Sequence, residues 1–178
     1  HLTLAREAHA RGLGVVLDVP AKFLKKAVGG RGLAPLLVKP NEVELAEWWG
    51  KPLRTERDLL DAAHAMAKHA AIVCVSLAEK GAWFVTRGHA WRGKAIRVKA
   101  RGTVGAGDSM VGAMCVRLAH HGLLECEDIA RLLRKSASSE LPSELQDVLT
   151  WGLAAGAATA QVSGTRLASA AEIRKLVR

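Results

Sequence analysis

The residues with the clearest chemical potential form the run Gly105-Ala106-Gly107-Asp108, a loop of small residues that ends in a carboxylate. The apolar residues after it recur with a helical period, so the loop is predicted to open a helix at Asp108. Backbone N–H groups at a helix start have no partner within the helix, and the helix dipole favours negative charge there. The loop therefore predicts a site for an anion such as a phosphoryl group.

Asp108 lies in the same place and can act as a base. Its ionised carboxylate could accept a proton from an attacking hydroxyl, while the loop N–H groups stabilise charge on a transferring phosphoryl group. A purely structural interpretation, in which Asp108 caps the helix and the glycines form a tight turn, stays open on spacing alone.

The elements that must position this loop alternate between helical and strand periods. Apolar strands separated by helices indicate an α/β fold with a mostly parallel sheet covered on both faces, in a single domain over residues 1–178. Strands are expected at 15–17, 36–38 and 72–76, with antiparallel pieces at 83–85 and 95–98. Helices are expected over 2–11, 21–28, 41–49, 55–69, 108–121, 127–138, 143–162 and 170–177, and residues 135–142 are the most loop-like stretch.

Three polar groups follow predicted strands: Lys39-Pro40-Asn41, Ser76-Leu77 and the loop at 102–108. Ligands of such sheets bind beyond the carboxyl ends of the strands, so these groups are expected to form one site. Lys39 could reach a phosphate there, or it could be a surface lysine before a proline.

Composition narrows the class of partner. The net charge of +9 comes from basic residues that are scattered along the chain, so we expect small polyanions and no nucleic acid. No apolar run reaches the roughly 18 residues of a membrane span, and no signal peptide opens the chain, so we expect a cytoplasmic protein without a membrane partner. The three cysteines show no Cys-x-x-Cys spacing and are expected to be free thiols.

Three segments together resemble the ribokinase-like carbohydrate kinases. They are Thr103-Val-Gly-Ala-Gly-Asp-Ser-Met-Val-Gly112, Leu37-Val-Lys-Pro-Asn-Glu-Val-Glu-Leu45 and Val75-Ser-Leu-Ala-Glu-Lys-Gly-Ala82. They occur in the order of that family, and the first two look most like its 1-phosphofructokinase branch. The resemblance covers essentially the whole chain and implies a three-layer fold with ATP and Mg²⁺ as cofactors.

The resemblance also implies a role for each matching residue. Asp108 would be the base that deprotonates the sugar hydroxyl, and Gly105, Ala106 and Gly107 would form the anion hole for the γ-phosphoryl group. Asn41 and Glu44 would organise Mg²⁺ through water, and the alternative for Glu44 is a solvated helix carboxylate. The residues expected to contact the nucleotide are Lys39, Asn41, Ser76, Gly81 and Thr103, with the helices from 143 to 165 as a wall for the adenine.

The chain departs from the family in two positions and in its extent. Ala78 stands where a second glycine is common, and Gly102 where a polar residue is common. The family's sugar-binding segment and lid strands would lie before His1. We therefore interpret the chain as the C-terminal part of a longer protein. A homodimer of that full-length protein is compatible with the resemblance.

The expected reaction is phosphoryl transfer from MgATP to a phosphorylated ketohexose, with fructose 1-phosphate giving fructose 1,6-bisphosphate. The alternatives are a sibling kinase acting on tagatose 6-phosphate, fructose 6-phosphate or a nucleoside, and a nucleotide-binding fragment without activity of its own.

Overall fold

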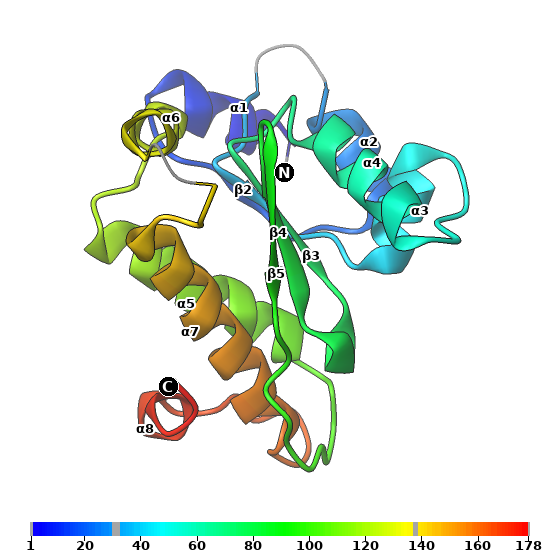
Figure 1. The fold of residues 1–178 in the computed structure, drawn as a ribbon, viewed down its shortest axis with the longest axis vertical. Helices are drawn as coiled ribbons and strands as arrows, with labels where there is room; N and C mark the ends of the chain where they lie inside the picture. The colour runs from blue at the N-terminus through cyan, green and yellow to red at the C-terminus, as the bar shows by residue number, and fades with distance from the viewer. Residues whose placement is uncertain (1, 30–32, 137–138, 178) are drawn as a thin grey trace.

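The computed structural model describes residues 2–29, 33–136 and 139–177, which form a sheet between two layers of helices (Figure 1). The strand order is β1-β2-β3-β4-β5. The strands are β1 (Val16–Leu17), β2 (Leu37–Val38), β3 (Ile72–Ser76), β4 (Ala82–Thr86) and β5 (His89–Gly93). The helices are α1 (Leu2–Ala10), α2 (Ala21–Ala27), α3 (Glu42–Trp49), α4 (Glu56–Met66), the 3₁₀ turn η1 (Ala78–Lys80), α5 (Ala106–His120), α6 (Cys126–Lys135), α7 (Ser143–Ala160) and α8 (Ala170–Arg174).

The sheet is mixed, and its parallel part carries the site. β1, β2 and β3 are parallel neighbours, so their carboxyl ends meet at one edge. β4 and β5 add to β3 as an antiparallel hairpin. The predicted α/β fold, a sheet covered by helices on both faces, is confirmed.

Alternation along the strands separates two hydrophobic cores. In β3, Val73 and Val75 belong to the core beneath α2, α3 and α4, whereas Ile72 and Cys74 belong to the core beneath α5, α6 and α7. Successive strand residues point to opposite faces, so a strand with both faces covered is apolar throughout. This is why the apolar run 72–75, which ends at Ser76, was a correct signal for a buried strand.

The prediction of a strand at 95–98 is wrong. The partner of β4 begins directly after Arg87-Gly88, in the register Thr86↔His89 to Ala82↔Gly93. Gly88 has a φ of 90°, and this left-handed residue closes a two-residue hairpin turn. β5 lies at the sheet edge with mostly partly exposed residues, so it lacks the apolar pattern by which a buried strand is recognised.

Helix ends follow the predicted capping signals in most places. Thr55 and Asp58 form the predicted capping box of α4, and Ser169 and Glu172 form that of α8. Ser143 is the first residue of α7 rather than its cap. The predicted helix 127–138 ends at Lys135, and part of the predicted loop 135–142 lies outside the described residues.

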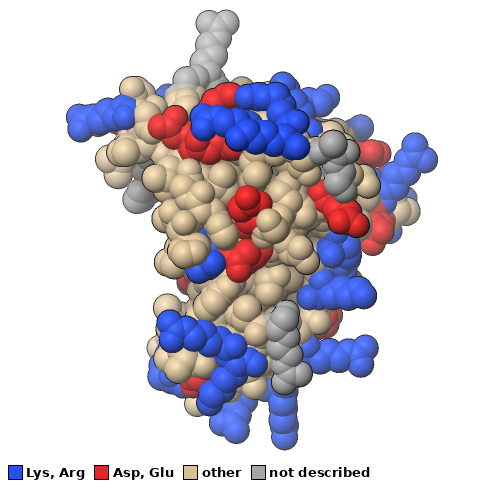
Figure 2. All heavy atoms as spheres, turned by 60° about the vertical axis from the view of Figure 1, so that its left-hand side comes forward, with Lys and Arg blue, Asp and Glu red and all other residues tan. Residues whose placement is uncertain are grey.

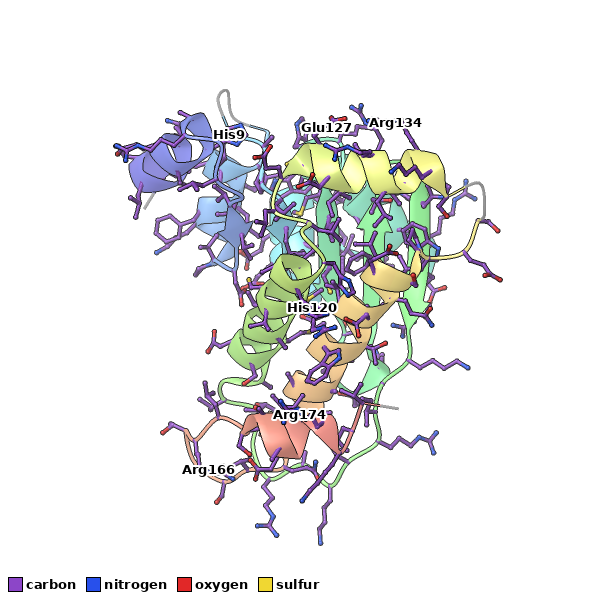
Figure 3. All side chains as sticks on the ribbon, turned by 90° about the vertical axis from the view of Figure 1, so that its left-hand side faces the viewer. His9, His120, Glu127, Arg134, Arg166 and Arg174 are labelled. Carbon is purple, nitrogen blue, oxygen red and sulfur yellow. The ribbon has the colours of Figure 1, made fainter. Side chains whose placement is uncertain are left out.

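Helices α5 and α7 lie side by side over the sheet, with α6 across one end of the pair and α8 across the other (Figure 3). Small residues allow this close approach. A Cβ on Gly152 would lie 2.7 Å from Met114 Cγ, and one on Gly156 would lie 3.4 Å from the carbonyl oxygen of Ala106. The start of α5 is therefore held against the second half of α7.

A charged cluster joins the other ends of the same two helices. Asp147 of α7 accepts hydrogen bonds from Arg117 Nε at 2.5 Å and lies 2.9 Å from His121 Nε2. The Arg117 guanidinium also lies over the Trp151 ring, 5.3 Å from its centroid. Partial burial by itself raises the pKa of Asp147, but the hydrogen bonds from His121 and Arg117 outweigh it and lower the pKa below its usual value.

An ion pair fixes the segment between α7 and α8. Arg166 Nη2 lies 2.9 Å from Glu172 Oε1, and Nη1 lies 3.2 Å from Oε2. Hydrogen bonds from Arg166, then from the backbone and hydroxyl of Ser169, lower the pKa of Glu172 to about 2. The turn that leads into α8 is therefore closed by a carboxylate that stays ionised throughout the neutral and weakly acidic range.

Within the described part of the chain, no helix is long and apolar enough to cross a membrane.

Asp147→Asn is expected to lower the free energy of unfolding at pH 7 by about 1–2 kcal/mol, because hydrogen bonds to a charged group contribute more than neutral ones. A carboxylate with a lowered pKa in the folded state stabilises above its unfolded pKa, near 3.9, and that contribution is lost as pH falls through the folded pKa. Urea denaturation of both proteins between pH 7 and pH 3 should therefore show the difference shrinking on acidification. Asp61→Asn, an exposed α4 carboxylate, is the control and should change stability by less than about 0.5 kcal/mol.

Candidate active site

The carboxyl ends of β1, β2 and β3 each deliver a polar side chain to the face covered by α5. Asp18 follows β1 directly, Lys39 follows β2 directly, and Ser76 ends β3. Because side chains alternate, Asp18 shares a face with Val16, Lys39 with Leu37 and Ser76 with Cys74. All three of these partners pack in the core beneath α5.

Lys39 is buried at the centre of this edge. It is 6% exposed, and its ammonium lies 3.2 Å from Asp18 Oδ1. A Cβ added to Gly107 would lie 3.3 Å from Lys39 Nζ, so the ammonium sits against the first turn of α5. The interpretation of Lys39 as a surface lysine is wrong, and the structure brings Lys39 together with the glycine loop.

The loop itself is shaped by Gly105, the residue that precedes α5. Its φ of 77° is left-handed, and a Cβ there would lie 2.6 Å from Leu167 Cδ2, so only glycine fits without displacement. The Ala106 N–H donates to the Thr103 carbonyl at 3.2 Å. Among the described residues, the N–H groups of Gly107 and Asp108 have no acceptor, which leaves them available to an anion.

Asp108 is the third residue of α5, not its cap. Gly105 occupies the cap position and makes no side-chain capping bond, so the interpretation of Asp108 as an N-cap is wrong. Its side chain is exposed, and within the described part of the chain it accepts no hydrogen bond and forms no ion pair. This carboxylate is therefore held at the helix start with both oxygens accessible.

Asn41 and Glu44 lie at the same sheet edge and are joined to each other. Asn41 Oδ1 accepts the Glu44 N–H and Glu44 Oε2 accepts the Asn41 N–H, both at 2.9 Å, so the pair is a capping box at the start of α3. Asn41 also forms an isolated parallel bridge with Ser76. The capping box uses one oxygen of each side chain and leaves Asn41 Nδ2 and Glu44 Oε1 for other partners.

The turn after β3 has unusual backbone geometry. Gly81 has a φ of 93°, and a Cβ there would lie 2.2 Å from the Gly93 carbonyl oxygen, so a larger residue cannot be accommodated. Ala78 is the one described non-glycine residue with a positive φ, 50°. A left-handed alanine costs about 1–2 kcal/mol, so the rest of the turn must hold Ala78 in this conformation.

The cysteines and the acidic and histidine side chains of the described residues add no further candidate metal or thiol site. All three cysteines are free, and burial raises the pKa of Cys74 to about 12, so it stays a thiol at neutral pH. Within the described residues, no group of three His, Cys, Asp or Glu side chains is arranged to hold a metal ion. On the face in Figure 2, Lys and Arg gather near the two ends and along the right-hand edge, and the middle is mostly tan with acidic side chains at its centre.

Sequence reasoning missed two residues that contact the site. Asp18 could have been found, because it follows a predicted strand just as Lys39 does. Thr159, which bonds to Ser109 beside Asp108, gave no signal, because a single threonine in an alanine-rich helix is typical of ordinary packing.

Comparison with known proteins identifies the family. Residues 2–172 match the pfkB family of carbohydrate kinases. 1-Phosphofructokinase of Escherichia coli strain K12 is 42% identical over 108 residues, which are 60% of this chain and 33% of that protein. ATP-dependent 6-phosphofructokinase isozyme 2 of the same strain is 31% identical over 175 residues, which are 97% of this chain and 49% of that protein.

The fold agrees with these similarities. The crystal structure of phosphofructokinase-2 from Escherichia coli in complex with substrates and products has a TM-score of 0.78 to this chain at 31% identity, covering 99% of this chain and 50% of that one. The chain therefore spans about half the length of the relatives that it matches almost throughout. With a family match over nearly all its residues, the chain belongs to the pfkB family of carbohydrate kinases.

Proposed function

We propose that this chain forms the ATP-binding and catalytic part of a kinase that phosphorylates a phosphorylated ketohexose, with the 6-hydroxyl of fructose 1-phosphate as acceptor. The observation that carries the proposal is the start of α5. There, the N–H groups of Gly107 and Asp108 lack acceptors, the Lys39 ammonium lies against Gly107, and the Asp108 carboxylate is accessible on the same turn.

This arrangement suits in-line phosphoryl transfer. Asp108 would take the proton of the attacking hydroxyl as the new P–O bond forms and the bond to the ADP oxygen breaks. The free N–H groups and the helix dipole would stabilise the charge on the three equatorial oxygens of the transferring group. Lys39 would add a positive charge that is already desolvated and held by Asp18, so little reorganisation is needed.

Asn41 and Glu44 fit a hydrated Mg²⁺. The oxygen of Glu44 that the capping box leaves free is a hard donor, and Mg²⁺ in nucleotide sites keeps several waters and takes few protein ligands. Such an ion would neutralise charge on the ATP phosphates. Ser76, Gly81 and Thr103 would lie along the nucleotide, and the end of α7 with the segment up to Thr165 would wall the adenine.

The choice of acceptor rests on the relatives. The 1-phosphofructokinase of Escherichia coli has the higher identity, 42% over 108 residues. The similarity to the 6-phosphofructokinase isozyme extends further, over 97% of this chain, and favours fructose 6-phosphate as the second candidate acceptor. Steady-state rates of the full-length protein with fructose 1-phosphate, fructose 6-phosphate and tagatose 6-phosphate decide between them.

Asp108→Asn in the full-length enzyme is expected to lower kcat by about 10²–10⁴-fold, the contribution of a general base, and to change the Kd for ATP little. A coupled ADP assay gives kcat, and calorimetry gives the Kd. Asp61→Asn makes the same chemical change on exposed α4 and should leave both values unchanged. Near-normal turnover of the Asp108 variant would contradict its role as base.

Lys39→Met is expected to lower both stability and turnover, because it removes the charge beside Gly107 and leaves Asp18 without its partner. The double variant Asp18→Asn/Lys39→Met should recover most of the stability, since no uncompensated charge remains, but not kcat. Urea denaturation and the ADP assay measure the two effects separately. Wild-type turnover in the double variant would show that Lys39 is only structural.

The chain of 178 residues by itself is expected to bind ATP more tightly with Mg²⁺ than without, and to transfer no phosphoryl group. The physical reason is that it spans about half of its relatives, so an acceptor site formed by the other half would be missing. Calorimetric titration with ATP, with and without Mg²⁺, checks the first part. Sugar phosphorylation by this chain alone would contradict the second.

A further inference from the structure

Thr159 is a buried polar residue that joins three segments. It is 1% exposed and lies near the end of α7. Its Oγ1 lies 2.8 Å from Ser109 Oγ, and either hydroxyl can be the donor. The same Oγ1 accepts the Ala168 N–H at 3.1 Å, so one atom connects α5, α7 and the segment before α8.

The position of Ser109 makes this connection relevant to the site. Ser109 directly follows Asp108, and its N–H donates to the Gly105 carbonyl at 2.9 Å. The glycine turn has few other restraints of its own, because Gly105 has no side chain and makes no capping bond. The Thr159–Ser109 bond therefore fixes the turn that carries Asp108.

The segment before α8 contacts the same turn directly. Leu167 Cδ2 lies 2.6 Å from where a Cβ of Gly105 would be, and Thr159 Cγ2 lies 3.9 Å from that point. The chain before the turn is also anchored to α7, since the Arg101 N–H donates to the Ala160 carbonyl at 2.7 Å. Both ends of the glycine loop and the segment 161–168 thus meet at the end of α7, on the side of the molecule where Figure 3 labels Arg166 and Arg174.

We propose that Thr159 is a positioning residue, which holds the N–H groups of Gly107 and Asp108 and the Asp108 carboxylate in register with the segment 161–168. This inference rests on the proposed function for its effect on catalysis. In that function the part of this segment up to Thr165 borders the nucleotide, and the glycine turn contacts its γ-phosphoryl group. One hydroxyl then couples the fit of the nucleotide to the geometry of the anion hole.

Thr159→Val is the central test, because valine has nearly the shape of threonine and carries a methyl group in place of the hydroxyl. Thr159→Ser keeps the hydroxyl and should rescue. Thr86→Val is the matched control: Thr86 is also fully buried, but among the described residues its Oγ1 has no hydrogen-bond partner.

The first readout, amide hydrogen exchange, does not depend on activity. In Thr159→Val, exchange should accelerate in peptides that cover 101–110 and 161–169, while Thr159→Ser and Thr86→Val keep the wild-type rates. Unchanged exchange in both segments would overturn the proposal whatever the enzyme does. If Thr159→Val does not fold, Ser109→Ala breaks the same hydrogen bond at a partly exposed position. Amide exchange in residues 101–110 should then accelerate in Ser109→Ala. Unchanged exchange in that variant would overturn the proposal.

The second readout separates positioning from stability. In the full-length protein, Thr159→Val should lower kcat by about 10-fold or more with less than about 3-fold change in KM for ATP, since misplacement of catalytic groups costs rate rather than ground-state binding. Thr159→Ser should recover kcat. If Thr159→Val has a lowered melting temperature but a normal kcat, Thr159 is merely structural and the proposal fails. If the wild-type protein has no kinase activity, the proposed function is refuted, while the result of the exchange experiment still stands.

Discussion

A lysine ammonium that is almost fully removed from water needs an anionic partner, and Lys39 obtains one from Asp18 at 3.2 Å. The two residues come from the ends of neighbouring parallel strands, so the pairing requires β1 and β2 to be in their observed register. The ammonium also lies close to Gly107, where a Cβ would be 3.3 Å from Nζ and would crowd it. This one charge therefore links the sheet edge to the helix that carries Asp108.

The close packing of α5 on α7 is the second constraint on the site. Gly152 and Gly156 allow the helices to approach, and the Arg117–Asp147 pair fixes their far ends. Near the glycine turn the contact is made by Thr159 and Leu167. The glycine turn has few side chains of its own to hold it, and the bond from Thr159 reaches it from a residue 50 positions after Ser109.

The similarity to longer kinases gives this arrangement its context. The chain matches the pfkB family over residues 2–172 while spanning about half the length of relatives such as the 6-phosphofructokinase isozyme 2 of Escherichia coli. The groups proposed for the nucleotide and the base all lie within this half. The proposed nucleotide site draws on the strand ends, the start of α5 and the end of α7, all of which belong to this chain.

The sequence by itself determined the class of fold, the strand ends and the glycine loop, because apolar period, capping residues and small-residue turns are local signals. It predicted β3, most helix starts and the approach of Lys39, Asn41 and Ser76 to one edge. It misplaced the partner of β4, since an edge strand with mixed residues carries no apolar period. It also left open whether Lys39 is a surface lysine or a phosphate contact, and whether Asp108 is a helix cap or a base. Only the tertiary structure showed that Lys39 is buried, that it pairs with Asp18 and that Thr159 bonds to Ser109 and Ala168. Each of these contacts joins residues that belong to different elements of the fold. Such contacts depend on how helices and strands pack, and no local pattern of residues records them.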